Sequence, residues 1–350
     1  MSSLLFWLSK HGPSVLAVGV LFGLAWPGLA AAARPLMPIT VFVFVLGPML
    51  RIDASLILAA LKRLRISVAL PLFVMVACPI LCGLAAQMAD LDPDLRLALV
   101  LAVSVPPSSG TAAVASTLNL DAAVPLVTTL VSMAMAPITV PLLGQWASAT
   151  TDTGMIAIGF FDLAWRLASL IGGAALVAVA LRRWAGRVLI DYALVLDAVV
   201  VISLLVFALA TMAGVRGVIE ASPGRAAGFI ALAYGCNIGL QLLAGTLFPG
   251  PTATRITVGL TNGNRNVGLI WSVLGTAASP TIALYFATTQ LPIYTLPRLT
   301  QGLLRRLRVN GRSQPTAPSL EIQGRALEEA QRASALQESG FHSEIEKGRL

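Results

Sequence analysis

Long apolar runs alternate with short polar or Gly/Pro-rich joints along most of the chain. Runs of about 20 apolar residues can cross a bilayer as helices, and prolines and glycines mark the joints between them. The pattern predicts an all-α membrane protein with ten transmembrane helices, at residues 13–33, 35–50, 66–88, 94–118, 121–147, 164–181, 190–213, 221–248, 251–274 and 280–299.

Two segments depart from this pattern. Residues 53–65 have an amphipathic spacing and are expected to lie at the membrane surface. From Asn310 onward the chain is polar and mixed in charge, which predicts a disordered cytoplasmic tail at 310–350. The transmembrane domain would then be residues 1–309, built from repeats at about 13–147 and 152–304.

The fourth and ninth spans carry polar, helix-breaking residues in their middle. The fourth contains "SVPPSSGT" (104–111) and the ninth "TNGNRN" (261–266). Proline removes a backbone donor, and glycine and asparagine tolerate non-helical dihedrals, so each span should break into two half-helices. Freed backbone groups survive at membrane depth only where protein or a water-filled cavity satisfies them.

The two breaks fall at corresponding places, each in the fourth helix of a set of five. Because five spans precede the second set, that set is inverted, and paired broken helices in inverted repeats are typical of secondary transporters that hold solutes at the breaks. The residues predicted to bind the solute are Ser108, Ser109, Thr111, Asn262, Asn264, Arg265 and Asn266. The plainer alternative is a pair of kinks with no ligand.

Arg265 is the most informative of these residues. An arginine at the centre of a membrane helix raises the free energy of insertion by about 2.5–3.5 kcal/mol and therefore usually has a functional role. It needs an acceptor, which could be a substrate carboxylate or sulfate, a carbonyl freed by the breaks, or an acidic side chain. Asp197 is the best-placed acid by position. Asn237 and Thr289 could also line the site, although polar side chains equally join helices to one another.

Charge and composition support a membrane carrier over other classes. Hydrophobic residues make up 57% of the chain and charged residues 11%, against about 25% charged in soluble domains. The net charge of +8 comes from basic residues in the joints and tail, a pattern that sets membrane orientation and does not indicate nucleic-acid binding. The more basic side should be cytoplasmic, which puts both termini inside a multi-pass inner-membrane protein.

Few residues could carry enzymatic or metal chemistry. The two histidines, His11 and His342, lie near the termini, and there is no HExxH or GxSxG motif. Neither an enzyme nor a metal or other cofactor is therefore expected. The three cysteines are Cys78, Cys82 and Cys236. Cys78 and Cys82 share a helix face, and all three are expected to be small buried residues.

Three segments resemble the bile acid:sodium symporter family. They are "VPPSSGTAAVASTLNLDAAVPLVTTLVSMAMAPITVPLL" (105–143), "GNRNVGL" (263–269) and "IYTLPRL" (293–299), and the similarity covers about 13–304. The resemblance implies ten helices in a panel and a core domain, with the fourth and ninth helices crossing where they unwind. It also implies alternating-access transport of organic anions, usually with two sodium ions.

The positions that bind sodium in such relatives are mostly changed here. A Ser-Asn pair reads Ala112-Ala113, a Glu and a Gln read Thr261 and Arg265, and a Gln before Pro79 reads Val74, whereas Thr129 and Asn266 match. Sodium needs several oxygen ligands, by analogy with other hard cations. We hypothesise that the guanidinium stands in for the cation and that coupling is to protons or absent. The ion-binding or charge-compensating candidates are Thr129, Thr261, Arg265 and Asp197.

The sequence thus predicts a secondary transporter of an organic anion, either bile-acid- or steroid-like or a small carboxylate, without the usual two-sodium coupling. Its partners would be that anion and the lipid bilayer. One alternative is a sodium-independent facilitator of an amphipathic solute. The other is a membrane sensor or scaffold that keeps the fold without transport.

Overall fold

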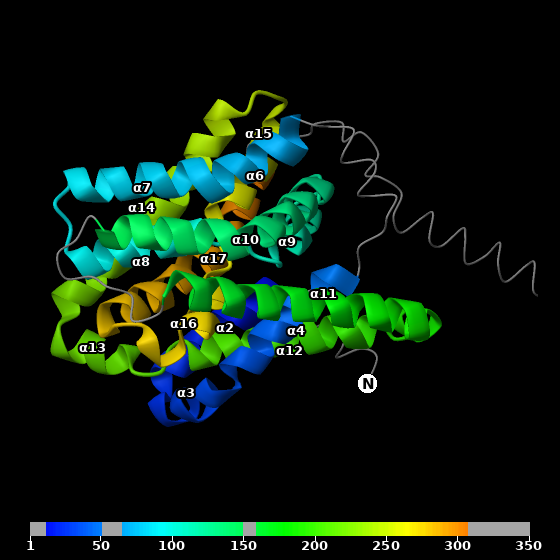
Figure 1. The fold of residues 1–350 in the computed structure, drawn as a ribbon, viewed down its shortest axis with the longest axis horizontal. Helices are drawn as coiled ribbons and strands as arrows, with labels where there is room; N and C mark the ends of the chain where they lie inside the picture. The colour runs from blue at the N-terminus through cyan, green and yellow to red at the C-terminus, as the bar shows by residue number, and fades with distance from the viewer. Residues whose placement is uncertain (1–11, 51–64, 150–158, 307–350) are drawn as a thin grey trace, which may run out of the picture. The chain divides into compact units, whose positions relative to one another are not determined.

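The computed structural model describes residues 12–50, 65–149 and 159–306, which form helices and, beyond one isolated bridge, no strand (Figure 1). The described residues include six helical stretches that are long and apolar enough to cross a membrane: Pro27–Leu50, Ile66–Met88, Ala123–Ser148, Phe160–Gly186, Ala198–Ala221 and Pro223–Leu247. The expectation of an all-α, multi-pass membrane protein is confirmed. The predicted surface segment 53–65, apart from Arg65, and the tail 310–350 lie outside the described residues.

The first joint of the chain lies earlier than predicted. Helix α2 (Gly12–Ala25) ends before Trp26, and α3 (Pro27–Ala33), the 3-10 turn η1 (Arg34–Leu36) and α4 (Met37–Leu50) follow as one stretch. The predicted boundary between 33 and 35 is therefore wrong. Trp26 is non-helical (φ −126°, ψ 77°), as expected of a residue before proline, whereas Arg34 stays helical and the tight turn accommodates Pro35.

The third predicted span is one stretch with two π-helical turns. It consists of η2 (Arg65–Ala69), α6 (Leu70–Leu72), η3 (Phe73–Ala77) and α7 (Cys78–Met88), where η2 and η3 are π-helical. In η3 the N–H of Cys78 bonds to the carbonyl of Phe73, five residues back. In the same π-helical pattern the carbonyl of Val74 would accept from the N–H of residue 79, but that residue is a proline and has no N–H. The Val74 carbonyl is thereby left for another donor.

The middle of the chain contains the first interrupted helix and the longest helix. Its elements are α8 (Pro93–Ser104), α9 (Thr111–Thr117), α10 (Ala123–Ala149), α11 (Phe160–Asp191), α12 (Ala193–Ala210) and α13 (Val215–Ala221). Helix α11 is longer than the predicted 164–181 and is kinked at Ala185, so Arg182 and Arg183 lie within a helix and not in a loop. This boundary prediction was wrong because basic residues also occur at helix ends near the membrane surface.

The last part of the chain repeats the order of the third to fifth spans. It consists of α14 (Pro223–Leu247), α15 (Thr252–Gly263), α16 (Val267–Leu274), the 3-10 turn η4 (Gly275–Ala277) and α17 (Pro280–Arg306). In both parts a long helix precedes an interrupted one, and a 27-residue helix follows it. The six candidate spans omit four predicted ones: the first, where α2 has 14 residues, the two interrupted helices, and α17 with its buried polar residues.

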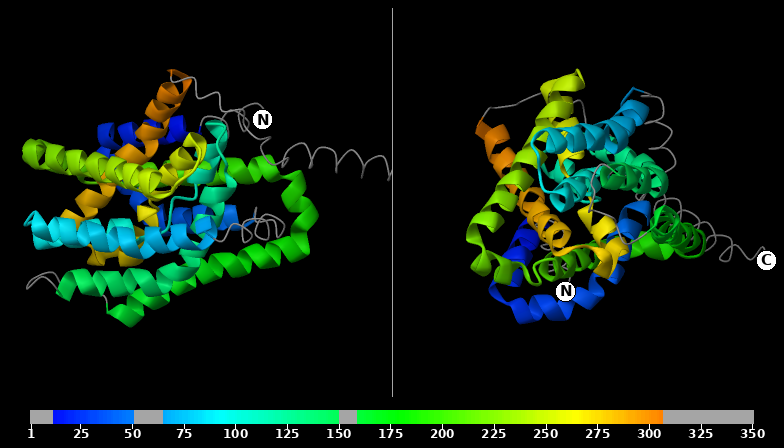
Figure 2. Two further views of the ribbon diagram at one scale, coloured as in Figure 1. Left: turned by 90° about the horizontal axis from the view of Figure 1, so that it is seen from above. Right: turned by 60° about the vertical axis from the view of Figure 1, so that its left-hand side comes forward.

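Three sets of helices pack around the interrupted segments (Figure 2). Helix α12 packs against α2 and α4; α7 and α10 both pack against α8; and α14 packs along α15 and against α17. Helix α11 joins two of these sets by packing against both α10 and α4. The interrupted segments are therefore enclosed by helices, as freed backbone groups require.

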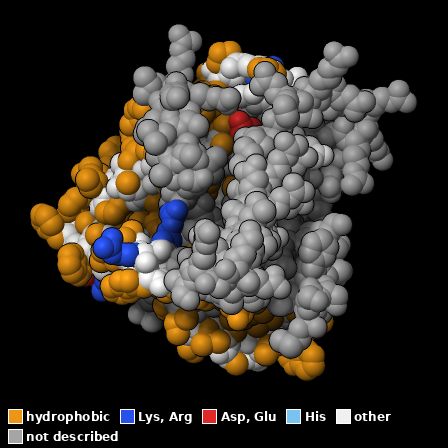
Figure 3. Space-filling view, turned by 90° about the vertical axis from the view of Figure 1, so that its right-hand side faces the viewer, with side chains coloured by type: hydrophobic (Ala, Val, Ile, Leu, Met, Phe, Trp, Pro, Cys, Tyr) orange, Lys and Arg blue, Asp and Glu red, His pale blue; other side chains and the backbone are white. Residues whose placement is uncertain are grey.

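Helix α11 shows how the protein meets the bilayer. Trp165 and Trp184 are 72% and 82% exposed and are separated by about 28 Å of helix at 1.5 Å per residue. An ion pair, Arg166 to Asp162 at 2.9 Å, lies at one end, and Arg182 and Arg183 lie at the other. This spacing matches a hydrocarbon core of about 30 Å with aromatic residues at both interfaces. Hydrophobic side chains dominate the described surface in Figure 3.

Candidate functional site

Both predicted helix breaks are present. Helix α8 ends at Ser104, Val105 is extended (φ −81°, ψ 156°), and α9 begins at Thr111. Helix α15 ends at Gly263, and Asn264 (ψ 99°) and Asn266 (ψ 64°) are non-helical before α16 begins. The first break follows from Pro106 and Pro107, because a residue before proline avoids the helical region.

The two breaks meet and pair through their backbones. The Ser108 N–H donates to the Asn264 carbonyl at 2.7 Å, and the Asn266 N–H donates to the Pro106 carbonyl at 2.8 Å. Pro107 and Arg265 face each other between these bonds in a short antiparallel bridge. Each break thus satisfies backbone groups that the other has freed, which makes the arrangement tolerable at membrane depth.

The second break has no proline, and α14 supplies its partners. Asn237 Nδ2 donates to the Gly263 carbonyl at 2.9 Å, which satisfies a terminal carbonyl of α15. Gln241 in turn donates to Asn237 Oδ1 at 2.6 Å. A Cβ at Gly263 would lie 2.9 Å from the Asn237 carbonyl oxygen, and one at Gly259 would lie 2.7 Å from that of Gln241. Glycine is therefore needed here for the close approach of the two helices.

Arg265 binds oxygens from three different segments. One terminal nitrogen donates to the carbonyls of Val74 (2.9 Å) and Val105 (3.3 Å), and the other donates to Asn262 Oδ1 (2.7 Å). The Val74 carbonyl is the one freed by η3 and Pro79, and the Val105 carbonyl is freed where α8 ends. Arg265 is 4% exposed, and its Nε has no hydrogen-bond partner among the described residues. The acceptors seen here are the freed carbonyls that the sequence offered as one option.

A small cavity adjoins the paired breaks, between α4 and α12 on one side and α17 on the other. Its residues are Phe44, Ser108, Leu204, Phe207, Arg265, Asn266, Val267, Gly268, Gln290, Ile293 and Tyr294, and none of these described residues is acidic. Asn266 Nδ2, like Arg265 Nε, is buried and without a hydrogen-bond partner in the described structure. Val267 and Gly268 begin α16, whose first N–H groups have no partner within the helix. Hydrogen-bond donors therefore gather at this cavity.

The cavity is closed to a large solute in this conformation. About 10 Å³ is accessible to the centre of a water molecule, which is about the room that one water needs. The rings of Phe44 and Phe207 pack edge to face in its wall, with centroids 5.4 Å apart. A Cβ at Gly268 would lie 2.6 Å from Phe207 Cζ, so α16 begins directly against this aromatic pair. A larger molecule would fit only if the helices that line the cavity moved apart.

The other predicted residues whose side chains the structure describes do not line this cavity. Asn262 and Asn264 are buried in the network just described. Thr111 is 2% exposed, and the hydroxyls of Ser109 and Thr111 are buried without a hydrogen-bond partner in the described structure. Thr129 is buried on α10. Asp197 lies on α12, but its side chain is outside what the structure describes.

Two predicted residues use their hydroxyls within their own helices. Thr261 donates to the Thr257 carbonyl at 2.7 Å, and Thr289 donates to the Phe286 carbonyl at 2.6 Å. Such bonds satisfy a hydroxyl locally. Asn237 acts as a connector between α14 and α15, which is the alternative that the sequence left open for it.

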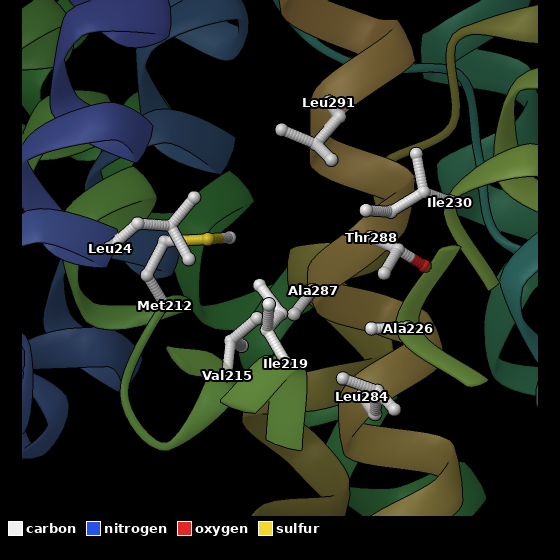
Figure 4. Close-up of a pocket in the computed structure, with 10 residues that line it drawn as sticks. All are labelled: Leu24, Met212, Val215, Ile219, Ala226, Ile230, Leu284, Ala287, Thr288 and Leu291. Carbon is white, nitrogen blue, oxygen red and sulfur yellow. The ribbon is translucent and has the colours of Figure 1, made fainter. Parts of the chain in front are cut away.

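A second cavity, lined by apolar residues of α2, α13, α14 and α17 and by Met212, lies apart from the breaks (Figure 4). About 30 Å³ of it is accessible to the centre of a water molecule. Thr288 is its one polar residue among those described, and none of the predicted solute-binding residues lines it. Its lining offers no charge to an anion.

Sequence reasoning missed the aromatic wall of the cavity. Phe44, Phe207 and Tyr294 lie in apolar helices. Their sequence context does not show whether such a side chain lines a cavity or faces lipid. The sequence did show Gln290 next to Thr289, but not which of them would reach the cavity.

No protein-family model and no curated protein matches this chain.

Proposed function

We propose that this protein is a secondary transporter that moves an organic anion across the inner membrane by alternating access. One observation carries the proposal: buried Arg265 and Asn266 each keep an unpartnered N–H donor and line a cavity that has no acidic residue among those described. An unpartnered buried donor costs about 1–3 kcal/mol, so it is retained more readily where a ligand supplies the acceptor.

The ligand that such a cavity fits is an anion with an apolar body. The donors of Arg265, Asn266, Ser108 and the start of α16 would bind a carboxylate or sulfate. Phe44, Phe207 and Tyr294 would contact the apolar part. Small carboxylates and larger steroid-like anions both meet this description, and the test below compares them.

The order of elements supports two inverted repeats and ten spans. The second set, α14, α15/α16 and α17, follows the same order as the first, α7, α8/α9 and α10. The two interrupted helices, α8/α9 and α15/α16, meet in the antiparallel bridge between Pro107 and Arg265. Helices α2, α4 and α12 would form the moving partner, because α4 and α12 close the cavity from one side. Both termini would be cytoplasmic, as the basic joints require.

Arg265 also supports transport without sodium. Its guanidinium already occupies the carbonyls of Val74 and Val105 and the side-chain oxygen of Asn262. Carbonyl and amide oxygens of this kind are ligands for hard cations, and a fixed positive charge among them opposes a second cation. Coupling to protons, or no coupling, follows.

A thermal-shift panel of organic anions tests the proposal. Purified protein would be heated with small carboxylates, amphipathic carboxylates and steroid sulfates, and with the neutral amide or alcohol of each. A ligand at 100 times its Kd stabilises by about 2.7 kcal/mol. We expect at least one anion to raise Tm while its neutral partner does not. Equal shifts with both partners, or none with any anion, would contradict the proposal.

A further inference from the structure

All three cysteines of the chain gather at one interface. Cys78 and Cys82 lie on α7 and Cys236 on α14, and the sulfurs of Cys82 and Cys236 are 3.8 Å apart. The three pack with Val103 and Leu240 in one small cluster. This meeting of Cys236 with the α7 pair could not be predicted from sequence, because 154 residues separate Cys236 from Cys82.

The cluster adjoins the network that holds Arg265. The Cys78 thiol donates to Asn262 Oδ1 at 3.3 Å, and the Arg265 guanidinium donates to the same oxygen at 2.7 Å. Cys82 and Cys236 are half-buried, in contrast to Cys78, which is fully buried. Two thiols in direct contact are the arrangement in which an oxidised cysteine is resolved by its neighbour to a disulfide.

We propose that Cys82 and Cys236 are a redox-active pair that a peroxide converts into a reversible disulfide joining α7 to α14. Cys78 is not the partner, because its sulfur is engaged with Asn262. Among the described residues no three His, Cys, Asp or Glu are placed to share a metal ion, which favours two-thiol chemistry over a metal centre.

The reaction balances with hydrogen peroxide as the oxidant. One thiolate sulfur attacks a peroxide oxygen, the O–O bond breaks, and a sulfenic acid forms while the departing hydroxide takes a proton to become water. The second thiol then attacks the sulfenic sulfur, the S–O bond breaks, and a second water leaves. Two thiols are oxidised and one peroxide is reduced. The sulfurs must approach by about 2 Å to reach the disulfide bond length of about 2.05 Å.

The disulfide would brace the paired breaks from outside. Helix α7 continues η3, whose Val74 carbonyl binds Arg265. Helix α14 carries the Leu240 carbonyl, which accepts from Asn262 Nδ2 at 2.8 Å, and Asn237, which binds the Gly263 carbonyl. A covalent bond between these helices fixes the spacing between η3, which binds the guanidinium directly, and α14, which holds Asn262.

Mass spectrometry of the intact, full-length protein tests the proposal. Reduced protein in detergent would be treated with hydrogen peroxide and digested without reductant. We expect the protein to lose two hydrogen atoms, peptides containing Cys82 and Cys236 to be joined, and dithiothreitol to reverse both. The joined peptides should persist in Cys78→Ser and be absent in Cys82→Ser and Cys236→Ser.

A second measurement tests the bracing. Oxidation should raise the Tm of the wild-type protein by at least about 2 °C and leave Cys82→Ser unchanged. Oxygen addition without a joined peptide, a bond to Cys78, or a bond between two protein molecules would overturn the proposal. An unchanged Tm in cross-linked protein would overturn the bracing. Neither measurement needs a transported solute, so a negative result here is distinct from failure of the transporter proposal.

Discussion

Arg265 donates a hydrogen bond of 2.9 Å to the backbone carbonyl of Val74, 191 residues earlier in the chain. The bond exists because a π-helical turn and Pro79 together deprive that carbonyl of a partner in its own helix. It ties the second interrupted helix to the helix before the first. The arginine therefore has a structural task as well as a proposed role toward the solute.

Replacing Arg265 should destabilise the protein. Arg265→Met leaves the carbonyls of Val74 and Val105 and the Asn262 side-chain oxygen without this donor, and each unsatisfied buried group costs about 1–3 kcal/mol. Part of that loss is offset, because a charge at membrane depth costs about 2.5–3.5 kcal/mol on insertion scales. We expect the free energy of unfolding, measured in detergent, to fall by about 2–3 kcal/mol. The stability of Arg265→Lys should lie between that of the wild type and that of Arg265→Met, since lysine lacks the planar guanidinium.

The matched control is Arg216→Met. Arg216 pairs with Glu220 at 2.8 Å, but their side chains are 49% and 62% exposed. Exposed pairs contribute about 0–1 kcal/mol. If Arg265→Met were as stable as Arg216→Met, the arginine would not be holding the paired breaks together.

Asn266→Asp should weaken anion binding while nearly keeping the shape of the side chain. The change replaces an unpartnered amide donor at the cavity with a negative charge beside the expected anion site. Repulsion in a poorly solvated cavity should weaken binding at least about tenfold, or 1.4 kcal/mol. Thermal shift with the best anion from the panel measures this. Asn119→Asp, at an exposed turn with φ 56°, is the control that should bind normally.

Gly268→Ala should impair the site through a single methyl group. The added Cβ would lie 2.6 Å from Phe207 Cζ and 3.1 Å from Phe44 Cζ. Overpacking of this kind costs about 1–3 kcal/mol, and here it pushes α4 and α12 at the cavity. We expect reduced flux in proteoliposomes and partial rescue by Phe207→Leu. Gly228→Ala, where nothing lies within 4 Å of the added atom, should behave as the wild type; an equal defect in both variants would point to a general effect of alanine.

Replacing potassium with sodium should leave the protein unchanged. The oxygens that could attract a cation at the breaks already accept from Arg265. We expect the same Tm and the same anion affinity in either salt. Sodium would stabilise by about 2.7 kcal/mol at 100 times its Kd if it bound the folded state alone, so a sodium-specific rise in Tm would show that the guanidinium does not substitute for the ion.

The helix breaks could be predicted from sequence because their causes are local. Pro106 and Pro107 disfavour the helical conformation in the residues before them, and Asn264, Arg265 and Asn266 are costly where an apolar run faces lipid. The all-α membrane class followed from the lengths of the apolar runs. In each case the signal lies within a few residues of the feature that it predicts.

The partners of the breaks could not be predicted, because they depend on contacts between distant helices. The sequence pointed to Val74 only as a changed side chain at a sodium-binding position, whereas what matters is its backbone carbonyl, which accepts from Arg265. Phe44 and Phe207 could equally have faced lipid. The boundary between the first two helices was misplaced because Pro27 and Pro35 both predict a helix end by their local sequence. In the structure only the residue before Pro27, Trp26, is non-helical.

A structure of the protein with the best-stabilising anion would show whether the paired breaks hold that anion. We expect density for the carboxylate or sulfate within hydrogen-bonding distance of Arg265 Nε and Asn266 Nδ2, with Phe44 and Phe207 moved apart. Density for the anion in the apolar cavity around Leu284 and Leu291, with the donors of Arg265 and Asn266 left unoccupied, would contradict it.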